Sequence, residues 1–157
     1  MAGVIYLIGK EWTHIITMDA DDQHNPEDSN LFREAIKINP QSLILGVRRF
    51  DSENIPTSSR FGRWWSNLWI RILTGISPMD SQSGFRAYNK TLFNDLVLSE
   101  KGMSISIEIL EKARRKGITI TGVPISCHYT HSTISLNAIK HGLRVSLSVI
   151  RIRFKKF

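Results

Sequence analysis

The sequence has 157 residues, 41% of them hydrophobic and 22% charged, which is enough for one domain with its own core and excludes disorder throughout. Its formal net charge of +7 favours a polyanionic partner or surface, with nucleic acid, an anionic membrane and phosphorylated substrates all open. The single cysteine, Cys127, excludes an intramolecular disulfide, and no run of about 18 uncharged apolar residues predicts a membrane-spanning helix.

The first third of the chain predicts two buried strands with a helix between them. Residues 14–18 and 42–47 are short apolar runs with polar flanks, as in buried strands. Between them, Asn25 is a good N-cap, Pro26 suits the first helical position and Asp28 is placed like the acid of a capping box. This order predicts a right-handed βαβ unit and a parallel sheet. The predicted apolar face of the helix consists of Leu31, Phe32, Ala35, Ile36 and Ile38.

The rest of the chain continues the alternation of helices and strands. Residues 48–59 are polar and predict a loop, residues 80–88 predict a loop leading into a short strand, and residues 92–98 and 105–116 predict helices. Residues 118–129 predict a strand that Pro124 makes an edge or a bent strand. We therefore expect an α/β domain over residues 1–134. Residues 135–157 carry a helical apolar stripe, and residues 143–149 also alternate like a strand; the length of the segment favours a basic amphipathic helix.

A tryptophan-rich helix is predicted over residues 60–75. Its apolar side chains recur at helical spacing, and its arginines share another face. Such a stripe is usually a core face, but tryptophans opposite arginines also suit the headgroup boundary of an anionic membrane. The predicted membrane-interface residues are Trp64, Trp65 and Trp69, and the basic tail, which ends in Lys155 and Lys156, favours the same location.

An acidic turn follows the first predicted strand. Asp19 and Asp21 are two residues apart, so an extended chain directs both side chains to the same side. Open α/β sheets bind ligands beyond the carboxyl ends of their strands. Hard oxygen ligands suit Mg²⁺ or Mn²⁺, which keep positions for water and phosphate oxygens. By itself an Asp-x-Asp pair is a weak signal, because acidic turns after strands are common.

Four ordered segments make the interpretation specific. Residues 18–28 (Met-Asp-Ala-Asp-Asp-Gln-His-Asn-Pro-Glu-Asp), 45–48 (Leu-Gly-Val-Arg), 80–88 (Asp-Ser-Gln-Ser-Gly-Phe-Arg-Ala-Tyr) and 122–125 (Gly-Val-Pro-Ile) resemble motifs of family 2 glycosyltransferases of the dolichyl-phosphate-mannose-synthase type. The resemblance covers nearly the whole chain. It implies a partial GT-A (Rossmann-like) fold, with a mostly parallel sheet flanked by helices and amphipathic interface helices.

The resemblance also implies roles for individual residues. Asp19, Asp21 and Gln23 would hold Mg²⁺ or Mn²⁺ and the diphosphate of the donor. Asp80 and Arg60 would be catalytic, with Asp80 either a general base or a carboxylate that orients the acceptor or the sugar. An ionised phosphate acceptor needs positioning more than deprotonation, which favours orientation. The implied substrate-binding residues are Arg48, Arg60, Gln82, Ser83 and Arg86, where Arg86 either supports the site electrostatically or braces its loop.

The implied activity is metal-dependent, inverting transfer of a sugar from a nucleotide-sugar donor to a polyprenyl or dolichyl phosphate. The implied location is peripheral, on the cytoplasmic face of a membrane. Two motifs at the start of the family's domain, which contact the nucleoside, have no counterpart in these residues. We therefore expect a second polypeptide to complete the domain, and the isolated chain to be unstable or inactive without it.

Two other interpretations remain open at this point. The chain could be an inactive truncated fragment or pseudoenzyme of the same family. It could also be a basic nucleic-acid-binding module, which its charge favours. Against that module, the tryptophans are predicted on an amphipathic helix rather than a strand platform, and no zinc spacing or helix-turn-helix pattern is present.

Overall fold

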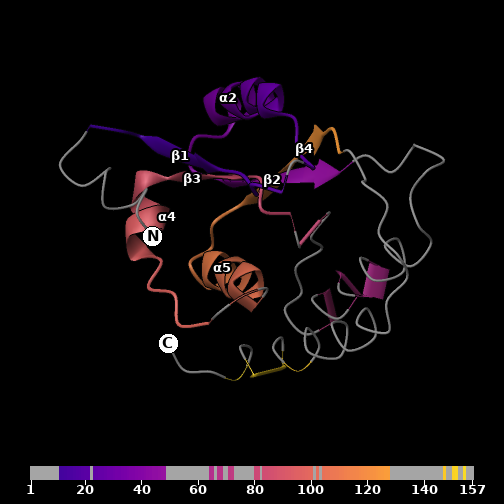
Figure 1. Cartoon of the computed structure of the whole chain (residues 1–157). Coiled ribbons are helices and arrows are strands. Elements are labelled where there is room, and N and C mark those ends of the chain that lie inside the picture. Colours follow the sequence, from indigo (N-terminus) through magenta and orange to yellow (C-terminus); the bar gives the residue numbers. More distant parts are fainter. Residues whose placement is uncertain are drawn as a thin grey trace.

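The computed structural model describes residues 11–21, 23–48, 64–65, 67–68, 71–72, 80–81, 83–100, 102, 104–127, 147, 150–151 and 154. Within them, helices alternate with strands in an α/β arrangement, which confirms the predicted fold class (Figure 1). The described residues between 64 and 72 and between 147 and 154 are helical. The elements in chain order are β1 (His14–Thr17), η1 (Pro26–Asp28), α2 (Ser29–Ile38), β2 (Leu43–Arg48), β3 (Arg86–Asn89), α4 (Lys90–Asp95), α5 (Ser104–Arg115) and β4 (Ile120–Ile125).

The four strands form one mixed sheet in the order β1-β3-β2-β4. β3 is antiparallel to both β1 and β2, whereas β4 is parallel to β2. β1, β2 and β4 therefore run in one direction and β3 runs in the other. β1 and β2 are parallel with α2 between them, as in the predicted βαβ unit, but the sheet is mixed rather than parallel, because the antiparallel β3 lies between β1 and β2. Its first residue, Arg86, pairs with Thr17 at the end of β1 and with Leu45 of β2.

Two hydrophobic clusters pack on opposite faces of the sheet, with α2 on one side and α5 on the other (Figure 1). β2 serves both: Ile44 belongs to the α2 cluster, and Leu43 and Leu45 belong to the α5 cluster. A central strand covered on both faces reads as a continuous apolar run, which is why residues 42–47 were recognisable from sequence. Phe32 of α2 stacks on Phe85 just before β3, with ring centroids 4.4 Å apart.

The start of α2 differs from the predicted capping box. Asn25 caps the short helix η1, where its side chain accepts a hydrogen bond from Glu27 N at 3.0 Å. Asp28 instead accepts a hydrogen bond from Ser126 N at 2.6 Å, which ties the helix start to the end of β4. Of the predicted apolar face of α2, Phe32 is buried, whereas Leu31 and Ile38 are 43% and 77% exposed.

β4 lies at one edge of the described sheet, as its proline predicted, and Pro124 is aligned with Val47 of β2. β1 lies at the other edge. Within the residues that the structure describes, no helix is both long and apolar enough to cross a membrane.

A buried carboxylate fixes the segment between α4 and α5. Glu108 of α5 is fully buried and accepts hydrogen bonds from Ser99 N, Ser99 Oγ and Glu100 N at 2.7–3.1 Å, and it also pairs with Lys112. Burial by itself raises the pKa of Glu108, but the N–H groups of Glu100 and Ser99, the Ser99 hydroxyl and Lys112 favour the charged form. Together these donors hold its pKa below the usual 4.5.

We predict that Glu108→Gln lowers the free energy of unfolding at pH 7 by about 2 kcal/mol, because an amide NH₂ would face N–H donors. Since folding lowers the pKa of Glu108, its stabilisation is complete above the pKa of the unfolded chain and is lost as pH falls through the folded value. Urea unfolding at pH 7 and at about pH 3 should therefore show the variant and the wild type converging in acid. Glu34→Gln, at an exposed pair with Lys37, is the control; equal losses from both substitutions would contradict the prediction.

Candidate active site

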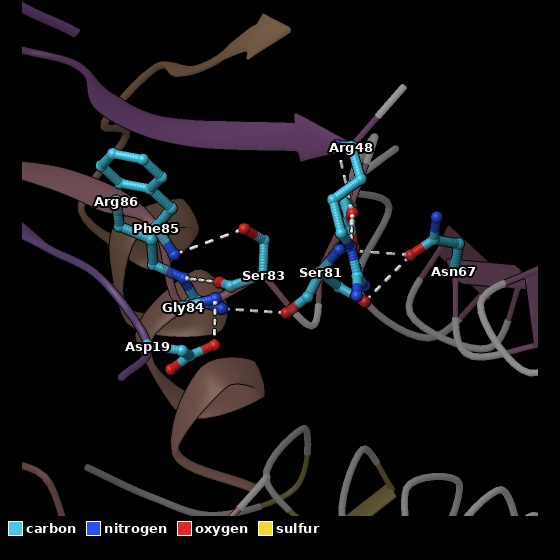
Figure 2. A network of polar contacts seen from close by, with 9 residues as sticks. Asp19, Arg48, Asn67, Ser81, Ser83, Gly84, Phe85 and Arg86 are labelled. Carbon is cyan, nitrogen blue, oxygen red and sulfur yellow. Dashed lines mark hydrogen bonds and ion pairs between the residues drawn. The ribbon is translucent and has the colours of Figure 1, made fainter. Parts of the chain in front are cut away.

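The predicted site residues converge on the edge of the sheet where β1 and β2 end. Asp19 follows β1, Arg48 is the last residue of β2, and the segment containing Asp80, Ser83 and Gly84 leads into β3. Because β1 and β2 run in the same direction, their carboxyl ends lie at one edge, and the loop before β3 crosses between them (Figure 2). This is where open α/β sheets bind their ligands.

Arg48 and Asp80 form a two-pronged ion pair. Nε and Nη2 of Arg48 donate to the two carboxylate oxygens of Asp80 at 2.7 and 2.9 Å, and the backbone N of Arg48 also donates to Oδ2 at 3.4 Å. Asp80 is fully buried, and the side chain of Arg48 is 17% exposed. The sequence predicted both residues for the site but not their pairing. This geometry makes Asp80 the residue that orients Arg48.

Arg86 lies in the interior, 2% exposed. Its Nε donates to the carbonyl of Ser83 at 2.7 Å, and its Nη2 donates to the carbonyl of Ser81 at 2.9 Å (Figure 2). The sequence left two roles open for Arg86, electrostatic support of the site and bracing of its loop. These contacts match the second role. Ser83 is also buried, and its Oγ accepts a hydrogen bond from Phe85 N at 3.3 Å. Both side chains therefore shape the loop from within.

The same loop is attached to the tryptophan-containing helical segment. Asn67 accepts hydrogen bonds from Ser81 Oγ at 2.9 Å and from Ser81 N at 3.4 Å. Asn67 had no predicted role in the site, and no sequence signal distinguished it from its neighbours. Trp64 is 56% exposed, and its ring lies 6.3 Å from that of Trp65 between centroids.

Asp19 and Thr17 hold the loop from the end of β1. Asp19 Oδ2 accepts a hydrogen bond from Gly84 N at 3.2 Å, and Thr17 Oγ1 donates to the carbonyl of Gly84 at 3.0 Å. Gly84 is therefore bonded through both of its backbone polar groups to the strand that carries the acidic turn. In the sequence, Gly84 stands out only as part of a motif, and Thr17 only as a member of the apolar run over residues 14–18.

The acidic turn itself is at the surface. Asp19 and Asp21 are exposed, and Asp21 Oδ1 accepts a hydrogen bond from Gln23 N at 3.2 Å, which closes the turn. After it, His24 is buried, pairs with Cys127 in an isolated β-bridge and packs against Phe85. His24 is thus a structural residue of the turn.

The donor set of this turn fits a magnesium-like ion better than a zinc-like one. Among the described residues, no group of three or more His, Cys, Asp or Glu side chains could enclose a metal. Mg²⁺ does not require such a group, because it is commonly held by one or two carboxylates together with substrate phosphates and water. Asp19 and Asp21, exposed at the end of β1, meet that requirement. Arg60, Gln82 and Trp69, also predicted for the site or the membrane interface, lie outside the described residues.

We predict that Asp80→Asn lowers the free energy of unfolding by about 3 kcal/mol, because it leaves the guanidinium of Arg48 without its buried counter-charge. Urea unfolding at pH 7 measures the change. Asp95→Asn is the matched control, since Asp95 pairs with Lys116 where both side chains are about half exposed, and its loss should stay below about 1 kcal/mol. Similar losses for the two variants would show that the Arg48–Asp80 pair is not a buried structural contact.

Comparison with known proteins gives several relatives that share one chemistry in their names. The chain is 29% identical to undecaprenyl-phosphate mannosyltransferase of Micrococcus luteus over 136 residues, which cover 79% of this chain and 55% of the relative. It is 27% identical to polyprenol monophosphomannose synthase of Mycolicibacterium smegmatis over 136 residues, covering 79% of this chain and 51% of the relative.

A third relative, the UDP-N-acetylglucosamine–dolichyl-phosphate N-acetylglucosaminyltransferase of Methanococcus voltae, is 27% identical over 149 residues, covering 90% of this chain and 59% of the relative. No protein-family model matches the chain. The chain spans about half the length of the curated relatives it matches. The resemblance predicted from the motifs is confirmed: the chain is homologous to glycosyltransferases of the family 2, GT-A type that are named for polyprenyl and dolichyl phosphates.

Proposed function

We propose that the chain is the acceptor-side part of a glycosyltransferase that moves a sugar from a nucleotide-sugar donor to a polyprenyl or dolichyl phosphate. The observation that carries the proposal is the meeting of two charged groups at one edge of the sheet. The exposed carboxylates of Asp19 and Asp21 follow β1, and the Arg48–Asp80 pair follows β2. The diphosphate of the donor would then meet a cation held by the carboxylates, and the phosphate of the acceptor would meet the guanidinium of Arg48.

On the donor side, Asp19, Asp21 and Gln23 would hold Mg²⁺ or Mn²⁺, which supplies positive charge to offset that of the departing diphosphate. In an inverting transfer, an acceptor phosphate oxygen forms a bond to the anomeric carbon, and the bond from that carbon to the diphosphate breaks on the opposite face. Arg60 and Gln82 are proposed to bind substrate on the basis of the family resemblance alone.

On the acceptor side, Arg48 would bind the lipid phosphate. Asp80 engages two nitrogens of that guanidinium, so the remaining polar hydrogens take a fixed direction. Since both oxygens of Asp80 already accept hydrogen bonds inside the protein, we propose a positioning role for it rather than that of a general base. The acceptor needs little deprotonation, because a phosphate monoester is largely ionised near neutral pH.

We also propose that the chain binds the membrane surface peripherally, at the cytoplasmic face. The described helical residues near the site expose large apolar side chains, with Trp64 at 56% and Ile72 at 62%. The helical residues of the tail do the same, with Leu147 at 60% and Phe154 at 80% exposed. Next to a surplus of basic residues, such side chains suit the boundary of an anionic bilayer.

A second polypeptide is proposed to complete the domain beside β1. Among the described strands, β1 pairs only with β3, and its four residues are only partly buried. An unpaired strand edge offers backbone N–H and C=O groups to another strand. A strand that supplies the nucleoside-binding part would be paired there.

The donor site is tested by calorimetry of UDP-sugars and GDP-sugars with the purified chain, with Mn²⁺ or with EDTA. We expect the diphosphate of either donor class to bind only when Mn²⁺ is present, and we expect no measurable Mn²⁺-dependent heat for Asp21→Asn, which removes a charged metal ligand. Equal signals from wild type and Asp21→Asn would refute the metal assignment. The same preparations should transfer no sugar by themselves; robust transfer would refute the need for a second polypeptide.

Membrane binding is tested by sedimentation with vesicles of phosphatidylglycerol and phosphatidylcholine, and with a DNA duplex at equal salt. We expect vesicle binding that weakens as salt rises, and about tenfold weaker binding for Trp64→Ala, since the indole would bury apolar surface in the bilayer. Ile38→Ala is the control, because Ile38 is 77% exposed on α2 and outside the proposed surface. Tighter binding to DNA than to vesicles would favour a nucleic-acid-binding module.

A further inference from the structure

Gly84 occupies a position that has no room for a side chain. A Cβ atom built on it would overlap the carboxylate of Asp19, with the carbon and both oxygens all far inside the 3.0 Å that real Cβ atoms keep. Backbone conformation does not explain the glycine, because the described glycines with positive φ are Gly102 and Gly117. The requirement at Gly84 is therefore space for the carboxylate of Asp19.

The close approach is part of a bonded arrangement. Gly84 N donates to Oδ2 of Asp19 at 3.2 Å (Figure 2). The carbonyl of Gly84 accepts a hydrogen bond from Thr17 Oγ1 at 3.0 Å. The described residues make no hydrogen bond to Oδ1 of Asp19. One oxygen of the carboxylate is thus held by the loop through a hydrogen bond, and the other lies against Gly84, within the space that a Cβ atom there would occupy.

We propose that Gly84 is a positioning residue for the metal ligand Asp19, and that this contact ties the metal turn to the loop carrying Asp80. The inference rests on the metal site of the proposed function and adds to it the residue that aims one ligand. Any side chain at position 84 rotates the carboxylate of Asp19 away. Because the overlap is with the end of a side chain, the fold can relax by that rotation while the ligand loses its direction.

The test is Mn²⁺ binding to the full chain without nucleotide, measured from the electron paramagnetic resonance signal of free Mn²⁺. Gly84→Ala should raise the dissociation constant about 10- to 100-fold, the usual effect of removing a group that orients a ligand. Gly46→Ala is the matched control. A Cβ there would lie 2.7 Å from Ile125 Cδ1 and 3.0 Å from the carbonyl oxygen of Phe85, so it crowds the same region without touching Asp19. It should lower stability and leave the dissociation constant unchanged.

The possible results separate the inference from the proposed function. If wild type and Gly84→Ala bind Mn²⁺ equally well, the role of Gly84 is refuted and the metal site stands. If the wild type binds no Mn²⁺, the metal site is refuted and the role of Gly84 with it.

A metal-free double-mutant cycle tests the contact itself. In EDTA, Gly84→Ala should lower the melting temperature of the wild type but lower that of Asp19→Ala less, because the alanine at position 19 has no carboxylate to displace. Equal shifts in the two backgrounds would overturn the inference. Should Gly84→Ala alone fail to fold, folding of the double variant would support the contact, and its failure would refute it.

Discussion

The arrangement of the site depends on a buried arginine. Arg86 is 2% exposed, and its guanidinium donates hydrogen bonds to the carbonyls of Ser81 and Ser83. Burying a cation is costly unless hydrogen bonds replace its hydration, and these carbonyls provide that replacement at the first residue of β3. The loop is thereby folded back on the strand it precedes. Asp80 and Gly84 then take positions near the ends of β2 and β1, where they meet Arg48 and Asp19.

The antiparallel direction of β3 explains why the loop before it contacts the carboxyl ends of both β1 and β2. β3 is antiparallel to its two neighbours, so its entrance lies at the edge where they end. If β1 and β2 were paired directly, the turns that follow them would be adjacent, but no segment would pass between them. Gly46 shows how tight this passage is, because its N donates to the carbonyl of Phe85 at 2.8 Å and its missing side chain leaves room for that carbonyl. Gly46 thus leaves room for Phe85 next to β2, and Gly84 leaves room for Asp19 next to the end of β1.

The parts of this arrangement that follow from local sequence could be predicted, and those that depend on distant pairing could not. The continuous apolar run of β2 and the proline in β4 gave strands in the right places because each signal lies within the strand itself. The antiparallel course of β3 could not be read from four residues, Arg86–Asn89, that are buried on both faces and include an arginine and an asparagine. Asp28 matched a local capping pattern, yet it bonds Ser126, 98 residues away, so a long-range contact replaced the local one.

The same distinction between local signals and distant contacts applies to the site residues. Motif resemblance identified Arg48 and Asp80 individually, but their pairing spans 32 residues and changes the interpretation of both. The buried carboxylate accepts two short hydrogen bonds from one guanidinium and so holds it in place, and an arginine held in this way presents its remaining donors in a fixed direction.

Under the proposed function, the pairing also bears on the repulsion between the two substrates. Donor diphosphate and acceptor phosphate repel each other, so a site that brings them together needs positive charge on both sides of the reacting carbon. The carboxylates after β1 would recruit that charge as a metal ion, whereas the end of β2 carries it permanently on Arg48, which Asp80 holds in place for the acceptor phosphate.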